Sequence, residues 1–188
     1  LEKCMDSVAK LLIPADALEV VIVDDGSDQE YDIEALQAKS PFAIKYVRKE
    51  HSGICATKNR AIEESTGEFI AFLDDDMVVS PLWLSRLMSG FINERIAGVG
   101  STNLTYPDNN SLTQYSDYRE LARRPFRDQT GEVLNVLTGS ACLRKKVLLE
   151  VGGFNQRQSA EGVPFGGDDV DITWKIRDAG YKFSHADD

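Results

Sequence analysis

The sequence predicts an α/β fold with a mainly parallel central sheet and helices on both faces of that sheet. Apolar, β-branched runs alternate with segments of helical periodicity through the first hundred residues, as in sheets whose strands are joined by crossover helices. Two of these runs, 18–23 and 69–73, end abruptly in aspartates, which a parallel sheet would gather at its carboxyl edge. The length of 188 residues and the hydrophobic content of 42% suit a single domain with a sizeable core.

The first half of the chain shows the alternation most clearly. Pro14 marks the end of the first helix, and the pair Ser80-Pro81 marks the start of the last one. The expected helices have apolar residues at helical spacing and cover residues 1–12, 33–39, 54–64 and 81–93. The expected strands are short apolar runs bounded by turn residues and cover residues 18–23, 42–48, 68–73 and 96–100.

The second half is less regular. Residues 102–131 are polar and dotted with aromatic side chains, so we expect loops there with one short helix at about 114–122. The other expected elements are a strand at 133–137, a small-residue turn at 138–140, a helix at 145–150, a glycine-containing loop at 155–167, a helix at 168–179 and a strand at 181–184.

Composition argues against several classes of partner. The formal net charge is −10, from 21 basic and 31 acidic residues, and this charge would repel the backbone of a nucleic acid. No stretch approaches the roughly 20 apolar residues of a membrane span, and no secretory signal opens the chain. Cys4, Cys55 and Cys142 lack C-x-x-C spacing and are expected to be reduced, partly buried thiols. We therefore expect a cytoplasmic protein, which could associate with the inner face of a membrane.

The triplet Asp74-Asp75-Asp76 follows the apolar run 69–73 directly. Three adjacent carboxylates repel one another, and a divalent cation such as Mg²⁺ or Mn²⁺ removes that repulsion while keeping a substrate phosphate as a further ligand. In an extended chain Asp74 and Asp76 would point the same way, about 6.6 Å apart along the strand. The alternative is an acidic turn whose aspartates cap the following helix.

Two further acidic clusters could join this site. Asp24 and Asp25 end the run 18–23, and their expected convergence with the triplet at one sheet edge favours a metal–nucleotide site. Asp168, Asp169 and Asp171 stand where a glycine loop turns into a helix. They could simply be carboxylates that the helix macrodipole favours at a helix start. Alternatively, one of them could serve as the general base that an attacking alcohol requires.

Taken together, these segments resemble the family 2 glycosyltransferases of the GT-A fold. The matching segments follow the family's order and span nearly the whole chain, so the set is far more specific than any single D-x-D triplet. They are Val21-Ile22-Val23-Asp24-Asp25-Gly26-Ser27, Ser52-Gly53-Ile54 through Lys58-Asn59-Arg60 with Gly67-Glu68-Phe69, Leu73-Asp74-Asp75-Asp76, Thr138-Gly139-Ser140 with Gly152-Gly153-Phe154, and Gly167-Asp168-Asp169-Val170-Asp171.

The resemblance implies an enzyme that moves a sugar, with inversion, from a nucleotide-diphosphate donor to an acceptor hydroxyl, with Mn²⁺ or Mg²⁺ as cofactor. The donor would be a UDP- or GDP-sugar, and the acceptor a carbohydrate or a lipid-linked molecule. The single domain 1–188 would comprise a nucleotide-binding half at about 1–100 and an acceptor-side half at about 101–188. Family members begin with a β-strand ahead of the helix in which this chain starts, so we expect a domain truncated at both ends.

The resemblance also implies which residues bind the donor. Asp24 and Asp25 would lie near the base and ribose of the nucleotide. Lys58 stands where the family usually has an arginine that approaches the base, and it lacks the planar fork of that arginine. Asp74 would lie near the ribose and the hydrated metal, with Asp75 beside it in the sugar-nucleotide site.

The same resemblance assigns the metal and acceptor positions. Asp76, with Asp74, would hold the cation that bridges the diphosphate. Asp169 would take the proton from the acceptor hydroxyl as it attacks the anomeric carbon. Asp168, which replaces the family's usual glutamate, and Gly139 would lie on the acceptor side.

Two residues keep alternative roles. His185 lies close to the position of a metal-facing histidine that many family members have, but it falls slightly early, and a strand-end histidine is the favoured interpretation. Trp174 could flank the acceptor or pack in the core, and we expect the core.

Two other functions also fit parts of the pattern. A nucleotidyltransferase binds nucleotides and metal on an α/β sheet, but it usually opens with a glycine-rich, basic phosphate loop that this chain does not show. A non-catalytic sugar-nucleotide-binding module would need the donor site but no base, so Asp169 argues against it.

Overall fold

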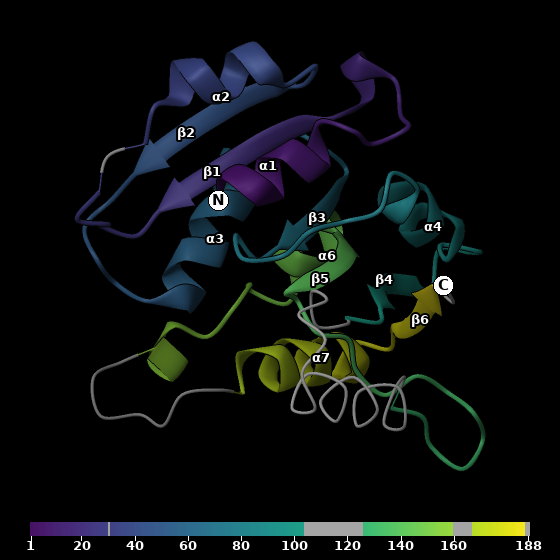
Figure 1. Cartoon of the computed structure of the whole chain (residues 1–188). Helices are drawn as coiled ribbons and strands as arrows, with labels where there is room; N and C mark the ends of the chain where they lie inside the picture. Colours follow the sequence, from purple (N-terminus) through teal and green to yellow (C-terminus); the bar gives the residue numbers. More distant parts are fainter. Residues whose placement is uncertain (30, 104–125, 160–166, 187–188) are drawn as a thin grey trace, which may run out of the picture.

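The structure, a computed structural model, describes residues 1–29, 31–103, 126–159 and 167–186, which form the expected α/β architecture (Figure 1). Its strands are β1 (Glu19–Asp24), β2 (Ala43–Arg48), β3 (Phe69–Leu73), β4 (Ile96–Ser101), β5 (Ser140–Arg144) and β6 (Lys182–Ala186). β1 and β2 form a sheet of their own, and the other strands form a second sheet in the order β3-β5-β4-β6.

Helices cover both faces of the larger sheet, as predicted. They are α1 (Glu2–Val8), α2 (Ile33–Lys39), α3 (Ile54–Glu64), α4 (Trp83–Ser89), α6 (Lys145–Glu150) and α7 (Asp168–Asp178), with short 3-10 helices η1 (Ala15–Ala17) and η2 (Gln156–Ser159). On one face, Leu87 of α4 packs in a buried cluster with Val99 and Cys142. On the other face, Leu148 of α6 and Ile172 of α7 join a second buried cluster. In Figure 1, α7 lies along the lower side of the molecule and α2 beside β2 at the top.

The larger sheet is mixed rather than mainly parallel. β1 pairs with β2, and β4 with β6, in the parallel sense, but β5 runs antiparallel to both β3 and β4. β5 was not predicted because Ser140–Arg144 contains no β-branched residue and begins with small residues, which resemble a turn. Every residue of β4 and β5 is buried, as expected for strands that are covered on both faces.

The helix α1 connects the two sheets. Cys4 and Val8 of this helix share a buried cluster with Val20 of β1 and Leu73 of β3. β1 and β3 are not hydrogen-bonded to each other, so packing on α1 helps to fix how far apart the carboxyl ends of these two strands lie.

Most predicted helices agree with the structure, and two are shorter than predicted. The bounds of α2, α3 and α6 match the expected ones. α1 ends at Val8 rather than Leu12. α4 begins at Trp83, not at Pro81, and ends before Gly90 rather than near residue 93. Gly90 lies so close to β4 that a Cβ on it would come within 2.6 Å of a Val99 methyl group, so a glycine is required there.

The expected strand at 133–137 does not form. Val133 makes only isolated bridges, to Arg127 and Phe183, although its side chain is buried. The apolar pattern of this run therefore reflects burial and not strand pairing. The helix expected at 114–122 lies outside the described residues.

The three thiols are free and buried, in agreement with their expected reduced state. In the described part of the chain, no helix combines the length and the apolar character needed to span a bilayer.

Candidate active site

β3 delivers the acidic triplet into a tight turn. The Met77 N–H donates to the Asp74 carbonyl oxygen at 3.1 Å, so the chain reverses at Asp75 and Asp76. The prediction that Asp74 and Asp76 point the same way from an extended chain is therefore wrong. The alternative, that these aspartates cap the next helix, also fails, because α4 begins after Leu82 and has no side-chain cap. Asp74 is half-buried, and Asp75 and Asp76 are exposed.

Asp74 lies directly against Gly139. The Asp74 N–H donates to the Gly139 carbonyl oxygen at 3.0 Å. A Cβ on Gly139 would come within 2.6 Å of Asp74 Oδ2, so only glycine leaves room for this carboxylate. Burial raises the pKa of Asp74; Lys58 opposes the increase, and the nearby Asp76 and Asp169 reinforce it.

Thr138, the residue before Gly139 in the same turn, holds Asp169. Asp169 Oδ1 accepts a hydrogen bond from the Thr138 N–H at 2.9 Å and a second one from the Thr138 hydroxyl group. Thr138 is completely buried, so it fixes the carboxylate against the sheet. Thr138 was predicted as part of a small-residue turn and of the segment that resembles the family's acceptor side, but only Gly139 of that turn was named as a site residue.

Lys58 joins both carboxylates at the start of α7. Its ammonium group is 2.7 Å from Asp168 Oδ2, 2.5 Å from the Thr138 hydroxyl oxygen and 3.9 Å from Asp169 Oδ1. It also lies 5.3 Å from the centre of the Phe154 ring, within the range of a cation–π contact. Lys58, which was expected near the nucleotide base, is thus buried among the acceptor-side residues and brings one positive charge to this acidic site.

Asn59, which follows Lys58 in α3, fixes this helix to the segment around Phe154. The Asn59 side-chain amide donates to the Phe154 carbonyl oxygen and accepts from the Phe154 N–H, each at 2.8 Å. A Cβ on Gly153, whose φ is +67°, would come within 2.5 Å of Asn59 Oδ1. The Gly152-Gly153-Phe154 segment therefore packs tightly against α3 and helps to orient Lys58, which is part of this helix.

The carboxyl end of β1 forms a separate polar cluster. Asp24 is buried and accepts hydrogen bonds from the Tyr46 hydroxyl group at 2.6 Å and from the Ser27 N–H at 2.8 Å. These bonds, with that from Tyr46 the stronger influence, lower the pKa of Asp24 to about 2.

Asp25 closes the loop that leads into α3. Its two oxygens accept from the N–H groups of Ser52 and Gly53, both at 2.9 Å, and from the Lys49 ammonium group. Burial alone would raise the pKa of Asp25, but these hydrogen bonds lower it. Asp24 and Asp25 contact their own loop, β2 and the loop before α3, whereas Asp74 contacts the 138–139 turn, Met77 and Cys4.

The two strand ends nevertheless border one cavity of about 700 Å³. Asp75 and Asp76 line it from the turn after β3, and Gln29, Tyr31 and Asp32 line it from the loop after β1. The first turn of α1 completes the lining. Its volume is within the range of about 300–1,000 Å³ that is typical of small-molecule sites.

The acidic turn offers oxygen ligands that suit Mg²⁺ or Mn²⁺. These ions are often held by one or two carboxylates, with the remaining positions taken by water and substrate phosphates. Asp74 and Asp76 fit that pattern, because Asp74 is fixed by Gly139 and Asp76 opens into the cavity. Among the described residues, no group of three or more His, Cys, Asp or Glu side chains is arranged so that it could coordinate a metal ion. His185 lies in β6, opposite Gly100 of β4.

Comparison with known proteins identifies the family of this site. The family model described as "Glycosyl transferase family 2" matches residues 1–152. The chain belongs to glycosyl transferase family 2. Glycosyltransferase AglE of Haloferax volcanii is 28% identical over 195 residues, covering 100% of this chain and 60% of AglE. The succinoglycan biosynthesis protein ExoM of Rhizobium meliloti is 38% identical over 91 residues, covering 47% of this chain and 29% of ExoM.

Solved structures of glycosyltransferases share the fold. The mannosyltransferase PcManGT from Pyrobaculum calidifontis, in complex with GDP-Man and Mn²⁺, has a TM-score of 0.72 and 20% identity, covering 98% of this chain and 50% of that one. S. aureus TarS has a TM-score of 0.70 and 18% identity, covering 99% of this chain and 54% of the TarS chain. The fold is therefore of the GT-A type. This family 2 chain spans 60% of the length of AglE and about half of the length of PcManGT and of the TarS chain 1–349.

Proposed function

We propose that this chain carries the donor-binding and catalytic residues of an inverting, metal-dependent glycosyltransferase. One observation carries the proposal: the turn at 138–139 contacts both halves of the site. Thr138 holds Asp169, and Gly139 contacts Asp74. A base for the acceptor and a carboxylate for the donor are thereby kept in a fixed relationship, which is what direct transfer between two bound substrates requires.

Asp169 acts as the general base. It takes the proton of the acceptor hydroxyl group while the hydroxyl oxygen bonds to the anomeric carbon of the donor sugar. The bond from that carbon to the diphosphate oxygen breaks at the same time, and the nucleoside diphosphate leaves with the electron pair. Attack opposite the leaving group inverts the anomeric centre. Thr138 orients Asp169, and Lys58 offsets the negative charge around it.

The donor occupies the cavity beside the acidic turn. Asp76, which lines this cavity, and Asp74 beside it would hold Mn²⁺ or Mg²⁺, and Asp75 lies next to Asp76 in the sugar-nucleotide site. A bound cation stabilises the negative charge that develops on the departing diphosphate. Asp24 and Asp25 belong to the nucleotide side, where they fix the loops after β1 and before α3.

The ligands of the structural relatives support this donor class. PcManGT was solved with GDP-Man and Mn²⁺, and TarS with UDP-GlcNAc. Both ligands are sugars on a nucleoside diphosphate, so we assign a UDP- or GDP-sugar as donor to this chain. The acceptor is a hydroxyl group of a carbohydrate or of a lipid-linked molecule.

Calorimetric titration with UDP and with GDP, each with and without Mn²⁺, tests the donor site. Binding of one nucleotide that needs Mn²⁺ and is lost in Asp76→Asn is expected. Asp32→Asn is the matched control, because Asp32 lines the same cavity but caps α2 through the Ala35 N–H and lies outside the acidic turn. Metal-independent binding of equal strength in wild type and Asp76→Asn would contradict the proposed metal site.

Hydrolysis of the donor separates catalysis from binding. In Asp169→Asn we expect donor affinity to persist and turnover to fall by about 10²–10⁴-fold, the usual contribution of a positioned base. Equal turnover in both proteins would exclude Asp169 as the base. Binding without turnover in wild type would favour a non-catalytic sugar-nucleotide-binding module, and release of diphosphate from a nucleoside triphosphate would favour a nucleotidyltransferase.

A further inference from the structure

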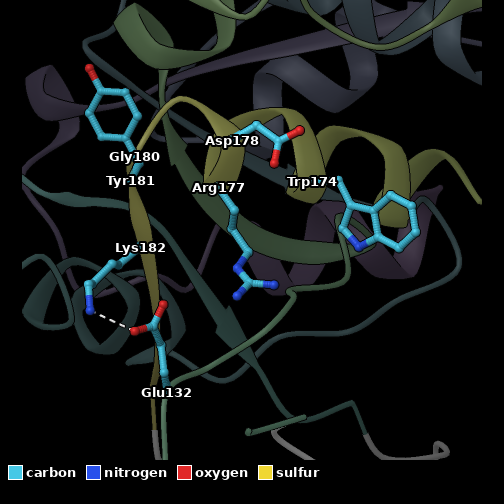
Figure 2. A pocket seen from close by; sticks show the side chains of 7 residues that line it. All are labelled: Glu132, Trp174, Arg177, Asp178, Gly180, Tyr181 and Lys182. Atoms are coloured by element: carbon cyan, nitrogen blue, oxygen red, sulfur yellow. Dashed lines mark hydrogen bonds and ion pairs between the residues drawn. The ribbon is translucent and has the colours of Figure 1, made fainter.

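A second cavity, of about 500 Å³, lies beside the carboxyl-terminal half of α7, away from the acidic turn. Figure 2 shows Trp174 on one side of it and the ion pair of Glu132 with Lys182 on the other, with Arg177 pointing between them. The Lys182 ammonium group is 2.6 Å from Glu132 Oε2, so this side of the cavity is fixed before any ligand binds.

Trp174 is the feature that needs an explanation. It was expected to pack in the core, but it is 64% exposed, so that prediction is wrong. The buried side of α7 is formed by Ile172, Thr173 and Ile176, which leaves Trp174 turned away from the core. An exposed indole in a cavity with polar walls offers a ligand both an apolar face and an N–H donor.

The side chains around Trp174 suit a molecule that is apolar on one face and rich in hydroxyl groups at its rim. Arg177 stands one helical turn after Trp174 and provides N–H donors. Glu132 and Asp178 provide acceptors. These acidic groups disfavour a polyanion, and the charged walls disfavour a purely apolar ligand. A pyranose ring, whose C–H face stacks on an aromatic side chain, fits both requirements.

The position of the cavity relates it to the proposed reaction. α7 carries Asp169 at its start and Arg177 about 12 Å further along the helix axis, at 1.5 Å per residue. Val170, which is also exposed, lies between them on the same side as Trp174. A chain of sugars that reaches this cavity would therefore pass from the side of α7 that carries Asp169, which faces Thr138, to the side that carries Val170 and Trp174.

We propose that the cavity of Trp174, Arg177 and Glu132 is a carbohydrate subsite that binds a sugar unit of an extended oligosaccharide acceptor, remote from the reacting hydroxyl. The inference rests on the proposed function, which leaves open whether the acceptor is a carbohydrate or a lipid-linked molecule. It narrows the acceptor to one with several sugar units.

The two tryptophans allow a direct test by nuclear magnetic resonance. The ¹⁵N-labelled chain is titrated with tetrasaccharides built from glucose, galactose, mannose, N-acetylglucosamine or glucuronate, up to about 10 mM, so that a Kd near 1 mM is detected. At least one should shift the indole N–H signal of Trp174. The signal of Trp83 should stay in place, because its indole N–H donates to Ser140 Oγ at 2.9 Å inside the protein.

Variants locate the binding. Trp174→Ala should weaken the affinity at least about tenfold, as expected when an aromatic anchor is removed, and Trp174→Phe should retain part of it. Leu149→Ala is the matched control, because Leu149 is an exposed apolar residue of α6 that does not line the cavity. Unchanged affinity in Trp174→Ala, or no shift with any tetrasaccharide, would overturn the proposal.

Other outcomes separate this inference from the proposed function. A Trp174 signal that moves with protein concentration alone would overturn the subsite and indicate self-association through this face. If nucleotide binding and donor hydrolysis succeed but no sugar binds, only the subsite fails. If a tetrasaccharide binds at Trp174 but no donor is bound or hydrolysed, the carbohydrate site stands and the transferase proposal fails.

Discussion

Gly139 and Asp74 are in such close contact that a single methyl group would separate them. A Cβ on Gly139 would come within 2.6 Å of Asp74 Oδ2 and within 3.1 Å of Met77 Cε. The contact joins the acceptor-side turn to the acidic turn after β3, where the metal site is proposed. The glycine is therefore favoured by its packing against the Asp74 carboxylate, since its backbone φ is not in the left-handed region.

Gly139→Ala should displace the Asp74 carboxylate and weaken Mn²⁺-dependent nucleotide binding by about tenfold or more, because metal sites tolerate only small shifts of their ligands. Calorimetric titration measures this loss. Gly67→Ala is the matched control, since its Cβ would meet only the Phe69 carbonyl oxygen, at 3.2 Å. Nucleotide affinity that survives in Gly139→Ala would show that Asp74 does not need this position.

Thr138→Val should lower turnover without weakening donor binding. The substitution keeps the shape of the buried side chain but removes the hydroxyl group that donates to Asp169 and accepts from Lys58. We expect donor hydrolysis to fall by about tenfold to a hundredfold, as for other groups that orient a reactive side chain. Thr138→Ser keeps the hydroxyl group and should retain most of the activity. A loss of donor affinity equal to the loss of turnover would indicate a purely structural role.

Lys58→Met should destabilise the fold strongly in the absence of metal. Lys58 is buried, and its removal leaves Asp168 and Asp74 without their positive neighbour, which typically costs about 3–5 kcal/mol. Mn²⁺ should restore stability to this variant more than to wild type, because it would supply positive charge at Asp74, one of these two carboxylates. Urea unfolding with and without Mn²⁺ measures both effects.

Lys45→Met is the control for Lys58→Met. Lys45 pairs with Glu64 at 2.5 Å but is half-exposed, and such surface pairs contribute at most about 1 kcal/mol. We expect Mn²⁺ to change the stability of Lys45→Met no more than it changes the stability of wild type. If Mn²⁺ stabilised both variants equally, the ion would not act at the carboxylates beside Lys58.

Local signals in the sequence account for what could be predicted. α3 begins after Gly53 and ends where the apolar spacing stops, so its bounds follow from the sequence alone. The aspartates at the ends of β1 and β3 were recognised because an apolar run followed by carboxylates is a local pattern. The family resemblance then followed from the order of these motifs.

What could not be predicted depends on contacts between distant segments. β5 was missed because its own residues resemble a turn, and it becomes a strand only through pairing with β3 and β4, which are distant in the sequence. Lys58 and Thr138 are 80 residues apart, and nothing in either segment indicates the hydrogen bond between them. Trp174 was expected in the core because a tryptophan on a helix usually is buried, whereas the periodicity of Ile172 and Ile176 places it on the outer side.

Stability in acid should depend on Asp24. The hydrogen bonds from Tyr46 and Ser27 lower the pKa of this buried carboxyl group to about 2, whereas in the unfolded chain it titrates at about 3.9. A lowered pKa in the folded state means that the carboxylate stabilises the protein at pH values above about 4. This stabilisation is lost as the pH falls towards about 2. At about 1.4 kcal/mol per pKa unit, it amounts to about 2.5 kcal/mol at neutral pH.

Tyr46→Phe removes the hydroxyl group that donates to Asp24 and should cost about 1–3 kcal/mol at about pH 7, because a hydrogen bond to a buried charge is lost. The same substitution should cost much less at about pH 2, where Asp24 is already about half protonated in the wild type. Urea unfolding at the two pH values measures the difference. Tyr181→Phe is the matched control, since the Tyr181 hydroxyl group donates to Glu150 at 2.9 Å on the surface, and the loss of stability should be small. An equal cost of Tyr46→Phe at both pH values would mean that the Tyr46 hydroxyl group stabilises the fold without lowering the pKa of Asp24.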